Sequence, residues 1–267
     1  MGVRIKTVHL EANNYCNLNC HFCFATFTPT GMNTEEVKGI IKKMAEHGSE
    51  LFCFTGGDPL LRNDIAELVK YIKEQGLKSA IDTNGLLASE QGLIELEPSL
   101  DRISLPLDGD NAGTQYLMRG SHALYGKSIE LMNTIDGLDI DLKINTLATR
   151  LNQDEIFNIG KIIESHNISQ WSIFQFNPVN RGKQYQSELE ISNDDFSRIE
   201  DKVRRYEFPF RVKFSRKKTE DTFFIISPQG IAYAVIKGEN HPFGDLKTQD
   251  VEEVLANHPK LAQPSYT

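Results

Sequence analysis

The sequence predicts an α/β fold with a parallel sheet. Two observations lead to this expectation: six short segments with strand character recur over the first two thirds of the chain, and helical patterns of about ten to fifteen residues fill most of the intervals between them. Such alternation builds parallel sheets, because each helix carries the chain back to the end where the next strand begins. With 267 residues the chain is long enough for one large core or two smaller ones.

The expected strands are short and apolar, and the expected helices carry recognisable start and stop signals. The first helix begins after Asn33 or Thr34, either of which can cap it, and ends at Gly48. We expect strands at residues 5–12, 50–57, 78–85, 101–109, 139–149 and 170–178, and helices at 33–48, 63–76, 89–97, 126–135 and 153–167.

The pattern changes after residue 180, where the regular alternation stops. The expected elements there are a helix at 194–207, antiparallel strands at 210–216, 221–230 and 231–238, and a last helix at 248–258. We therefore divide the chain into a parallel α/β domain, residues 1–180, and a small α+β extension, residues 181–267, that closes one side of the curved sheet.

Composition and charge narrow the functional classes. The net charge is −8, which disfavours stable binding to nucleic acid or to an anionic membrane. No run of about 18 or more apolar residues is present, and the start of the chain lacks the apolar stretch of a signal peptide, so we expect a cytoplasmic protein without membrane association. In that reducing compartment the four cysteines are expected to be metal ligands or redox groups rather than a disulfide framework.

Three of the four cysteines lie within eight residues, after the first expected strand. Cys16, Cys20 and Cys23 have the spacing C-x3-C-x2-C, and three thiolates so close together can bind one soft metal centre. A structural zinc ion needs a fourth ligand, for which His9 and His21 are the nearest candidates. A zinc-stabilised binding module is therefore one alternative, and three unligated thiols are another. The favoured interpretation is a [4Fe–4S] cluster with one iron left open.

Small and polar residues gather where the expected strands end. Ligands of parallel α/β folds bind at the carboxyl ends of the strands, so these segments mark the expected site. The segments are residues 15–23, 55–59, 82–85, 104–109, 145–150 and 175–180. The fourth cysteine, Cys53, lies in an apolar strand and is expected to be a buried core thiol. Trp171 and Phe174 are expected in the core or the wall of the sheet.

The segment Tyr-Cys-Asn-Leu-Asn-Cys-His-Phe-Cys-Phe resembles the cluster loop of the radical S-adenosylmethionine (radical SAM) superfamily, and the resemblance covers about residues 5–180. It implies a partial (βα)6 barrel, similar to an incomplete TIM barrel. It also implies a [4Fe–4S] cluster on the three cysteines, S-adenosylmethionine (SAM) on the open iron, and an electron donor such as flavodoxin or ferredoxin. In that family one electron cleaves SAM to a 5′-deoxyadenosyl radical, which removes a hydrogen atom from the substrate.

Further segments match the family's SAM-binding positions. Thr-Gly-Gly-Asp-Pro, residues 55–59, is similar to the family's Gly-Gly-Glu-Pro, although aspartate stands where glutamate is usual. The resemblance implies that this segment receives the ammonium group of SAM and that Arg119 pairs with its carboxylate. The implied SAM contacts are Phe22, Gly56, Gly57, Asp58, Ser104, Arg119 and Asn145. A strand-ending turn, a solvated arginine and a satisfied amide are the structural alternatives.

The substrate is less well specified. Residues 142–150 and 171–182 resemble segments of viperin-like, nucleotide-modifying members of the family, although Ser172 stands where a lysine is usual. A small phosphorylated substrate such as a nucleotide is therefore favoured over a peptide or another metabolite. No cysteine follows Cys53 to bind the auxiliary clusters common in peptide-modifying members. Substrate contacts are expected at Asn84, Lys143, Arg150, Asn177 and Arg181, with Lys183 and residues 216–218 extending a basic rim.

Overall fold

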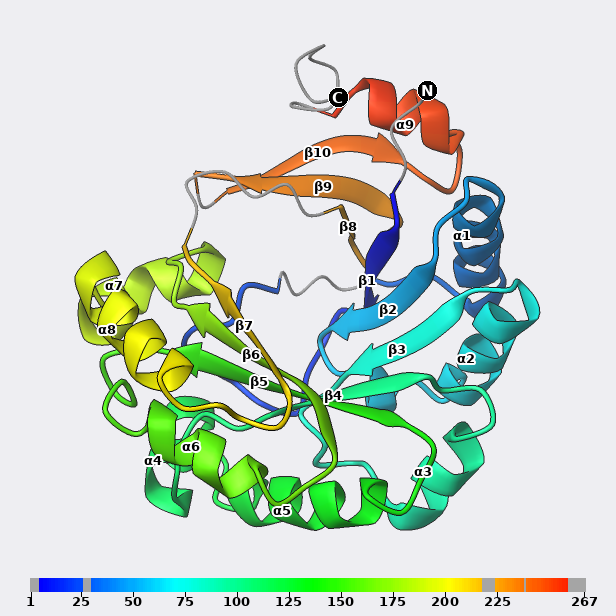
Figure 1. Cartoon of the computed structure of the whole chain (residues 1–267). Coiled ribbons are helices and arrows are strands. Elements are labelled where there is room, and N and C mark those ends of the chain that lie inside the picture. Colours follow the sequence, from blue (N-terminus) through cyan, green and yellow to red (C-terminus); the bar gives the residue numbers. More distant parts are fainter. Residues whose placement is uncertain (1–4, 26–29, 218–223, 238, 259–267) are drawn as a thin grey trace.

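The strands form one curved sheet with helices on its outer side. The computed structural model describes residues 5–25, 30–217, 224–237 and 239–258. Within them the strands line the inside of the curve, and most helices cover its convex side (Figure 1). This arrangement is the open barrel of parallel strands that the sequence predicts.

Six parallel strands, each paired with its successor in the chain, confirm the expected order of elements. They are β1 (Thr7–Asn13), β2 (Leu51–Gly56), β3 (Lys78–Asp82), β4 (Arg102–Pro106), β5 (Asp141–Ala148) and β6 (Ile168–Gln175). The later strands are β7 (Arg211–Ser215), β8 (Ile225–Ile226), β9 (Ile231–Ile236) and β10 (Glu239–Asp245). The complete order across the sheet is β10–β9–β8–β1–β2–β3–β4–β5–β6–β7.

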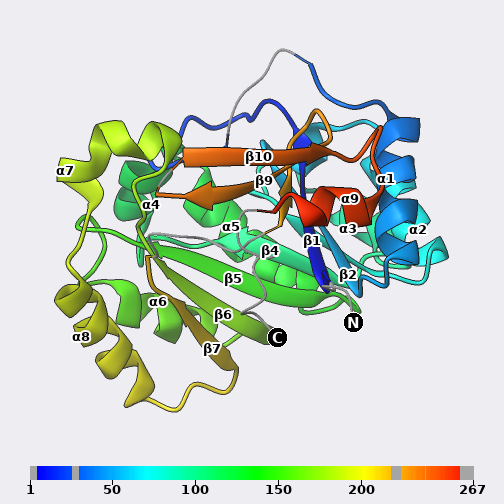
Figure 2. The same cartoon turned by 90° about the horizontal axis from the view of Figure 1, so that it is seen from above.

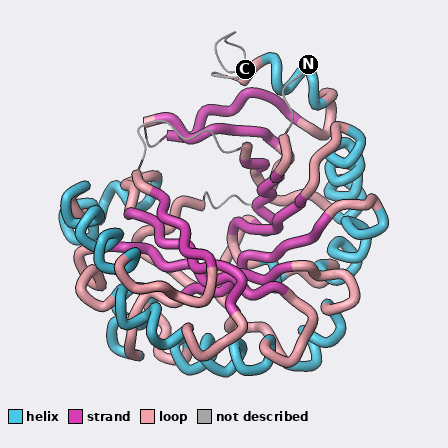
Figure 3. Tube along the Cα trace, viewed as in Figure 1, coloured by secondary structure: helices cyan, strands magenta, loops and turns pink. Residues whose placement is uncertain are grey.

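Helices connect most of the parallel strands (Figure 3). They are α1 (Thr34–Glu46), α2 (Ile65–Glu74), α3 (Glu90–Leu96), α4 (Ala112–Arg119), α5 (Leu124–Ile135), α6 (Ile156–Ile163), α7 (Gln186–Leu189), α8 (Asn193–Arg204) and α9 (Val251–Ala256). Asn33 caps α1, where its side chain and that of Glu36 form a reciprocal capping box. In the part of the chain that the structure describes, no helix combines the length and the apolar character needed to cross a membrane.

The C-terminal part corrects several expectations. The sequence predicts antiparallel pairing for residues 210–216, but β7 is parallel to β6, because α8 lies between them and returns the chain as a crossover helix does. β8 is parallel to β1 and antiparallel to β9, and β10 is an additional antiparallel strand. Residues 221–223 of an expected strand lie outside the described residues. The sheet continues from β6 to β7 across residue 180, and the division into two domains stays a prediction.

The two faces of the parallel strands differ in chemistry. Val8, Leu10, Phe52 and Phe54 belong to the main hydrophobic core together with apolar side chains of the helices. Because side chains alternate along a strand, the residues between them face the other way, and we call that side the concave face. Its residues on β1 to β7 include His9, Glu11, Cys53, Asp82, Arg102, Ser104, Lys143, Asn145 and Lys213. Figure 2 shows these strands from above, with α1 and α2 beside β1 and β2.

Candidate functional site

The three clustered cysteines lie on the loop that follows β1. The backbone N–H of Cys23 donates to the carbonyl of Cys20 (3.2 Å), and the N–H of Leu18 donates to Sγ of Cys16 (3.4 Å). Cys20 is buried, and the other two are half-buried. Burial raises the pKa of all three thiols, so their thiolate forms need a positively charged partner such as a metal.

The arrangement of possible ligands fits a cluster better than a single zinc ion. In the described part of the chain, one trio of His, Cys, Asp or Glu ligand atoms lies within 4.8 Å of one another, and it consists of His9, Cys53 and Asp82. Tetrahedral zinc ligands at about 2.3 Å from the metal lie about 3.8 Å apart, and the three loop thiols do not all lie within 4.8 Å of one another. More widely spaced thiolates suit separate irons of one cluster. The other zinc candidate, His21, stacks on Tyr185 with 3.9 Å between ring centres.

Gly56 and Gly57 hold the end of β2 against β1 and the cysteine loop. Gly56 has a φ of +94°, and a Cβ there would lie 2.5 Å from Cα of Glu11. A Cβ on Gly57 would lie 1.9 Å from the carbonyl oxygen of Tyr15. The two glycines are therefore required by contacts within the chain. Their predicted role toward SAM stays a prediction.

Asp58 is buried and joins the ends of β2 and β3. Its carboxylate accepts hydrogen bonds from Oγ1 of Thr83 (2.9 Å), the N–H of Asn84 (2.8 Å) and the N–H of Leu60 (3.0 Å). Burial raises the pKa of Asp58, and these hydrogen bonds oppose the rise. Both oxygens thus already have protein donors. Its contact with the SAM ammonium stays a prediction, and the contacts seen here are structural.

Asn84, whose N–H donates to Asp58, also contacts the cysteine loop through its side chain. Its Nδ2 donates to Oδ1 of Asn17 (2.7 Å) and lies 3.7 Å from Sγ of Cys16. Its Oδ1 accepts from the N–H of Leu86, so the side chain has partners at both ends. The structure therefore places Asn84 against the loop, and its contact with the substrate stays a prediction.

Arg119 lies beside the loop at the end of α4, a helix that the sequence analysis missed. Its Nε donates to Oδ2 of the fully buried Asp108 (2.6 Å), and its guanidinium carbon is 4.9 Å from the ring centre of Phe22. Its carbonyl oxygen lies 3.9 Å from Sγ of Cys20. Burial lowers the pKa of Arg119, but Asp108 and the nearby thiols more than offset this, so the net pKa is raised and the side chain is charged.

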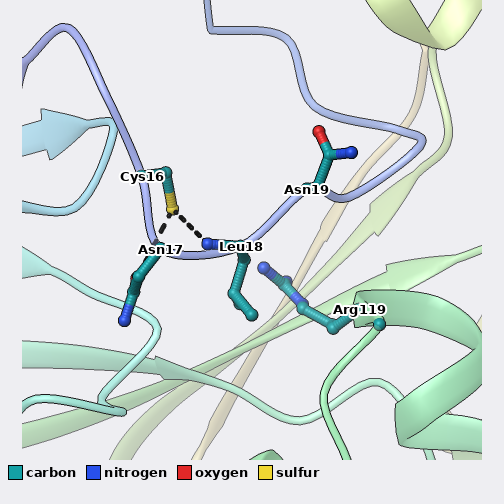
Figure 4. A pocket seen from close by; sticks show the side chains of 6 residues that line it. Cys16, Asn17, Leu18, Asn19 and Arg119 are labelled. Atoms are coloured by element: carbon teal, nitrogen blue, oxygen red, sulfur yellow. Dashed lines mark hydrogen bonds between the residues drawn. The ribbon is translucent and has the colours of Figure 1, made fainter.

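A cavity of about 380 Å³ adjoins the loop and this arginine (Figure 4). Its lining residues are Cys16, Asn17, Leu18, Asn19, Arg119 and Gly120. The guanidinium donates through Nε to Asp108 and also acts on the thiol of Cys20, so its positive charge lies beside the loop at this cavity, where an anionic ligand could pair with it. Arg119 and two of its predicted companions, Phe22 and Cys20, are therefore brought together.

The concave face holds buried polar atoms that the described residues leave without a hydrogen-bond partner. On adjacent strands these include Oδ1 of Asp82, Nε of Arg102, Oγ of Ser104 and Oδ1 of Asn145. The sheet register places Asp82 beside Ser104 and Ser104 beside Lys143. Buried polar atoms in native proteins nearly always have partners, so this wall is suited to bind water or a ligand. Ser104 and Asn145 are two of the SAM contacts predicted from the sequence.

Positive charge gathers on the same wall. Lys143 interacts electrostatically with Asp82, Arg102 and Lys213, and its Nζ lies 5.9 Å from the ring centre of Phe174. Burial lowers the pKa of Lys143, and the negative charge of Asp82 opposes this. Lys143 is a predicted substrate contact, whereas Arg102 and Lys213 were not predicted from the sequence. The alternation of polar residues along β4 and β5 is the signal that could have identified Arg102.

The other basic residues of the predicted rim are held in pairs with protein groups. The contacts are Lys183 with Glu239 (3.2 Å), Lys217 with Glu190 (2.8 Å), Arg216 with Glu200 (2.5 Å), Arg150 with the carbonyl of Glu190 (3.3 Å) and Arg181 with Oδ1 of Asn19. Asn177 follows β6, and Lys218 lies outside the described residues. The predicted rim residues therefore have protein partners in the ligand-free chain, and their contact with a substrate stays a prediction.

Residues expected in the core are found there. Trp171 is fully buried, and its Nε1 donates to Oγ1 of Thr146 (2.9 Å). Phe174 is half-buried in the wall beside Lys143. Cys53 is fully buried as expected, although it faces His9 and Asp82 rather than the apolar core.

Comparison with known proteins gives an independent view of the same residues. The family model of the radical SAM superfamily matches residues 10–160. An S-adenosylmethionine-dependent nucleotide dehydratase of Flammeovirga pacifica is 30% identical over 240 residues, which cover 85% of this chain and 81% of that protein. An AdoMet-dependent heme synthase of Oleidesulfovibrio alaskensis is 29% identical over 199 residues, which cover 73% of this chain. The match spans only about half (51%) of that heme synthase.

A solved structure has the same fold. Streptococcus suis SuiB bound to S-adenosylmethionine matches with a TM-score of 0.78 over 97% of this chain and 67% of its own, at 16% identity. At that identity the likeness concerns the fold alone. It agrees with the curved parallel sheet and the loop after β1 described above.

Proposed function

Because this chain belongs to the radical SAM superfamily and is thus a radical SAM enzyme, we propose that Cys16, Cys20 and Cys23 hold a [4Fe–4S] cluster whose open iron binds SAM. The observation that carries this proposal is the loop after β1, which holds one buried and two half-buried thiols beside Arg119. The two candidates for a fourth zinc ligand have other partners: His21 stacks on Tyr185, and His9 lies beside Cys53. The zinc-stabilised binding module is accordingly set aside.

The residues around the loop have defined parts in this proposal. The cluster with bound SAM supplies a 5′-deoxyadenosyl radical that takes a hydrogen atom from the substrate. Arg119, held by Asp108, presents its Nη groups to the carboxylate of SAM. Ser104 and Asn145 offer unpartnered polar atoms to SAM. Asn84 and Asp58 keep the loop in place, which preserves the distance between the radical source and the substrate.

We further propose that the substrate is a nucleotide and that its phosphates bind the positive wall of Arg102, Lys143 and Lys213. The nucleotide dehydratase relative supports this class, since its match covers most of both chains. The unpartnered Nε of Arg102 supports it as well, because a phosphate oxygen accepts hydrogen bonds from such donors. The proposed reaction is dehydration of the nucleotide. The electron would come from an external donor such as flavodoxin or ferredoxin.

The test is an anaerobic assay of the iron-loaded protein with dithionite and SAM against deuterium-labelled CTP, GTP and UTP. Deuterium found in 5′-deoxyadenosine identifies the hydrogen donor and supports the proposal. A labelled low-molecular-weight cell extract serves as the second arm. Transfer from the extract but from none of the nucleotides would reject a nucleotide substrate and leave the radical chemistry standing.

A further inference from the structure

One carboxyl group on the concave face has no role so far. Glu11 lies on β1, five residues before Cys16, and is 1% exposed. Neither Oε1 nor Oε2 has a hydrogen-bond partner among the residues that the structure describes. Glu11 is therefore a buried acid whose two acceptor atoms are both unused.

The surroundings of Glu11 compensate its charge only in part. Its backbone packs against Gly56, which closes the side toward β2. Tyr233 of β9 lies near enough to act on the pKa of Glu11, but its hydroxyl is not at hydrogen-bonding geometry to either carboxylate oxygen. Burial raises the pKa of Glu11 to about 7, and Tyr233 opposes the rise. Cys23 of the loop is near enough to respond to its charge, although no hydrogen bond joins the two.

An unpartnered buried carboxyl group is costly to a folded protein, whether ionised or neutral. Glu11 differs in this respect from Asp58 and Asp108, which are equally buried but accept hydrogen bonds from two or more protein groups each. It differs also from Lys143, which has a charged neighbour in Asp82. A bound molecule that donates hydrogen bonds would remove this cost.

We propose that Glu11 is the subsite that receives a hydrogen-bond-donating group of the substrate, a hydroxyl or an amino group. The anionic end of the same molecule then lies against Arg102, Lys143 and Lys213, because a carboxylate repels phosphate. Glu11 thus sets the direction in which the substrate lies across the sheet. The inference rests on the proposed function, since it places the substrate on the concave face.

The experiment compares CTP with three analogues that each alter one donor: 2′-deoxy-CTP and 3′-deoxy-CTP lack a hydroxyl, and UTP carries a carbonyl in place of the amino group and gains an N3–H. Dissociation constants are measured anaerobically on the SAM-loaded holoenzyme, and KM and kcat in turnover. The proteins are wild type, Glu11→Ala, Glu11→Gln and the control Glu46→Gln, whose side chain is 66% exposed on α1. Melting temperature and iron content confirm that each variant folds and binds its cluster.

We expect wild type to bind one analogue about 10- to 100-fold more weakly than CTP, as for the loss of a hydrogen bond to a charged group. Glu11→Ala should bind that analogue and CTP within about threefold of each other, whereas Glu46→Gln should keep the wild-type ratio. An unchanged ratio in Glu11→Ala, or equal binding of all analogues by wild type, would overturn the inference.

Failure of the nucleotide proposal is recognised separately. If wild type binds none of these nucleotides, the proposed function fails, and Glu11 is then tested with the deuterium-labelled cell extract. Loss of deuterium transfer in a folded, iron-loaded Glu11→Ala supports the subsite. Transfer at the wild-type rate in that variant rejects it.

Discussion

Two regions of the molecule are both polar and buried: the ends of β2, β3 and β4, and the concave face. They differ in whether the protein itself supplies hydrogen-bond partners for their polar atoms. At the strand ends, Asp58, Asn84 and Asp108 each have protein partners, and together they support the cysteine loop. On the concave face, atoms of Glu11 and Ser104 have none among the described residues. The first region is complete as a framework, and the second is completed by what binds there.

This difference separates two kinds of sequence constraint. Framework residues are fixed by the chain itself, so their substitution should affect folding and the loop. If concave-face residues serve the proposed ligand, their substitution should affect binding more than folding. The variants that follow test this division.

The largest effect is expected from Cys20→Ala. Removing one of three ligands should abolish iron incorporation and SAM cleavage, because the remaining two thiols cannot hold the cluster. Cys53→Ala is the matched control, since Cys53 is also buried but lies with His9 and Asp82. Iron content and 5′-deoxyadenosine release are the measurements. A Cys20→Ala protein that still cleaves SAM would contradict the ligand assignment.

Gly57→Ala should cost the framework about 3 kcal/mol of unfolding free energy or more, because the new Cβ would collide with the carbonyl oxygen of Tyr15. Gly39→Ala in α1 is the control: no atom lies within 4 Å of its added Cβ, and alanine should stabilise the helix by about 1 kcal/mol. Anaerobic urea unfolding measures both. Equal stability of the two variants would mean that the end of β2 is not packed closely against the loop.

Much of the framework could be predicted from sequence, and the reasons are local. Period-two apolar strands, capped helices and the C-x3-C-x2-C loop are signals within short segments. The predicted antiparallel direction of β7 was wrong, because strand direction depends on the helix that precedes the strand and not on the strand's own residues. The helix α4 was not predicted, so no local signal indicated that Arg119 would meet Asp108 and Phe22.

The concave face was harder to predict, because its residues are neighbours only through sheet register. Arg102 and Lys213 come from strands far apart in the chain but act on the same lysine. The sequence around Glu11 has no unusual feature. Its importance follows from the fold, in which both carboxylate oxygens are buried without a hydrogen-bond partner among the described residues. The sequence contains both the lysines of the predicted rim and the acidic residues that pair with them, but it does not show which residues pair. Only the fold pairs Lys183 with Glu239.

Glu11 should give the protein a distinctive dependence of stability on pH. Its pKa rises from 4.5 in the unfolded chain to about 7 in the folded one, so the folded state holds a proton that the unfolded state has lost. Stability from this group is fully present below pH 4.5 and is lost as pH rises to about 7. The loss is about 3 kcal/mol.

Anaerobic unfolding at pH 5 and pH 8 checks this expectation. Wild type should lose about 2.5 kcal/mol more than Glu11→Gln between the two pH values, since glutamine does not titrate and part of the loss already occurs below pH 5. Glu46→Gln, altered on the exposed surface of α1, should follow wild type. The same pH dependence in wild type and Glu11→Gln would show that the carboxyl group is already solvated or paired.

The smallest of these effects is expected from Lys143→Met. The substitution removes one positive charge from the concave face and keeps much of the side-chain volume, so CTP should bind about tenfold more weakly, or about 1.4 kcal/mol. Unfolding free energy should change less than binding, because burial already disfavours the charge of Lys143 in the ligand-free protein. Lys42→Met, on the exposed side of α1, is the control. A variant that lost stability but kept its affinity would assign Lys143 to the framework and remove the distinction between the two regions.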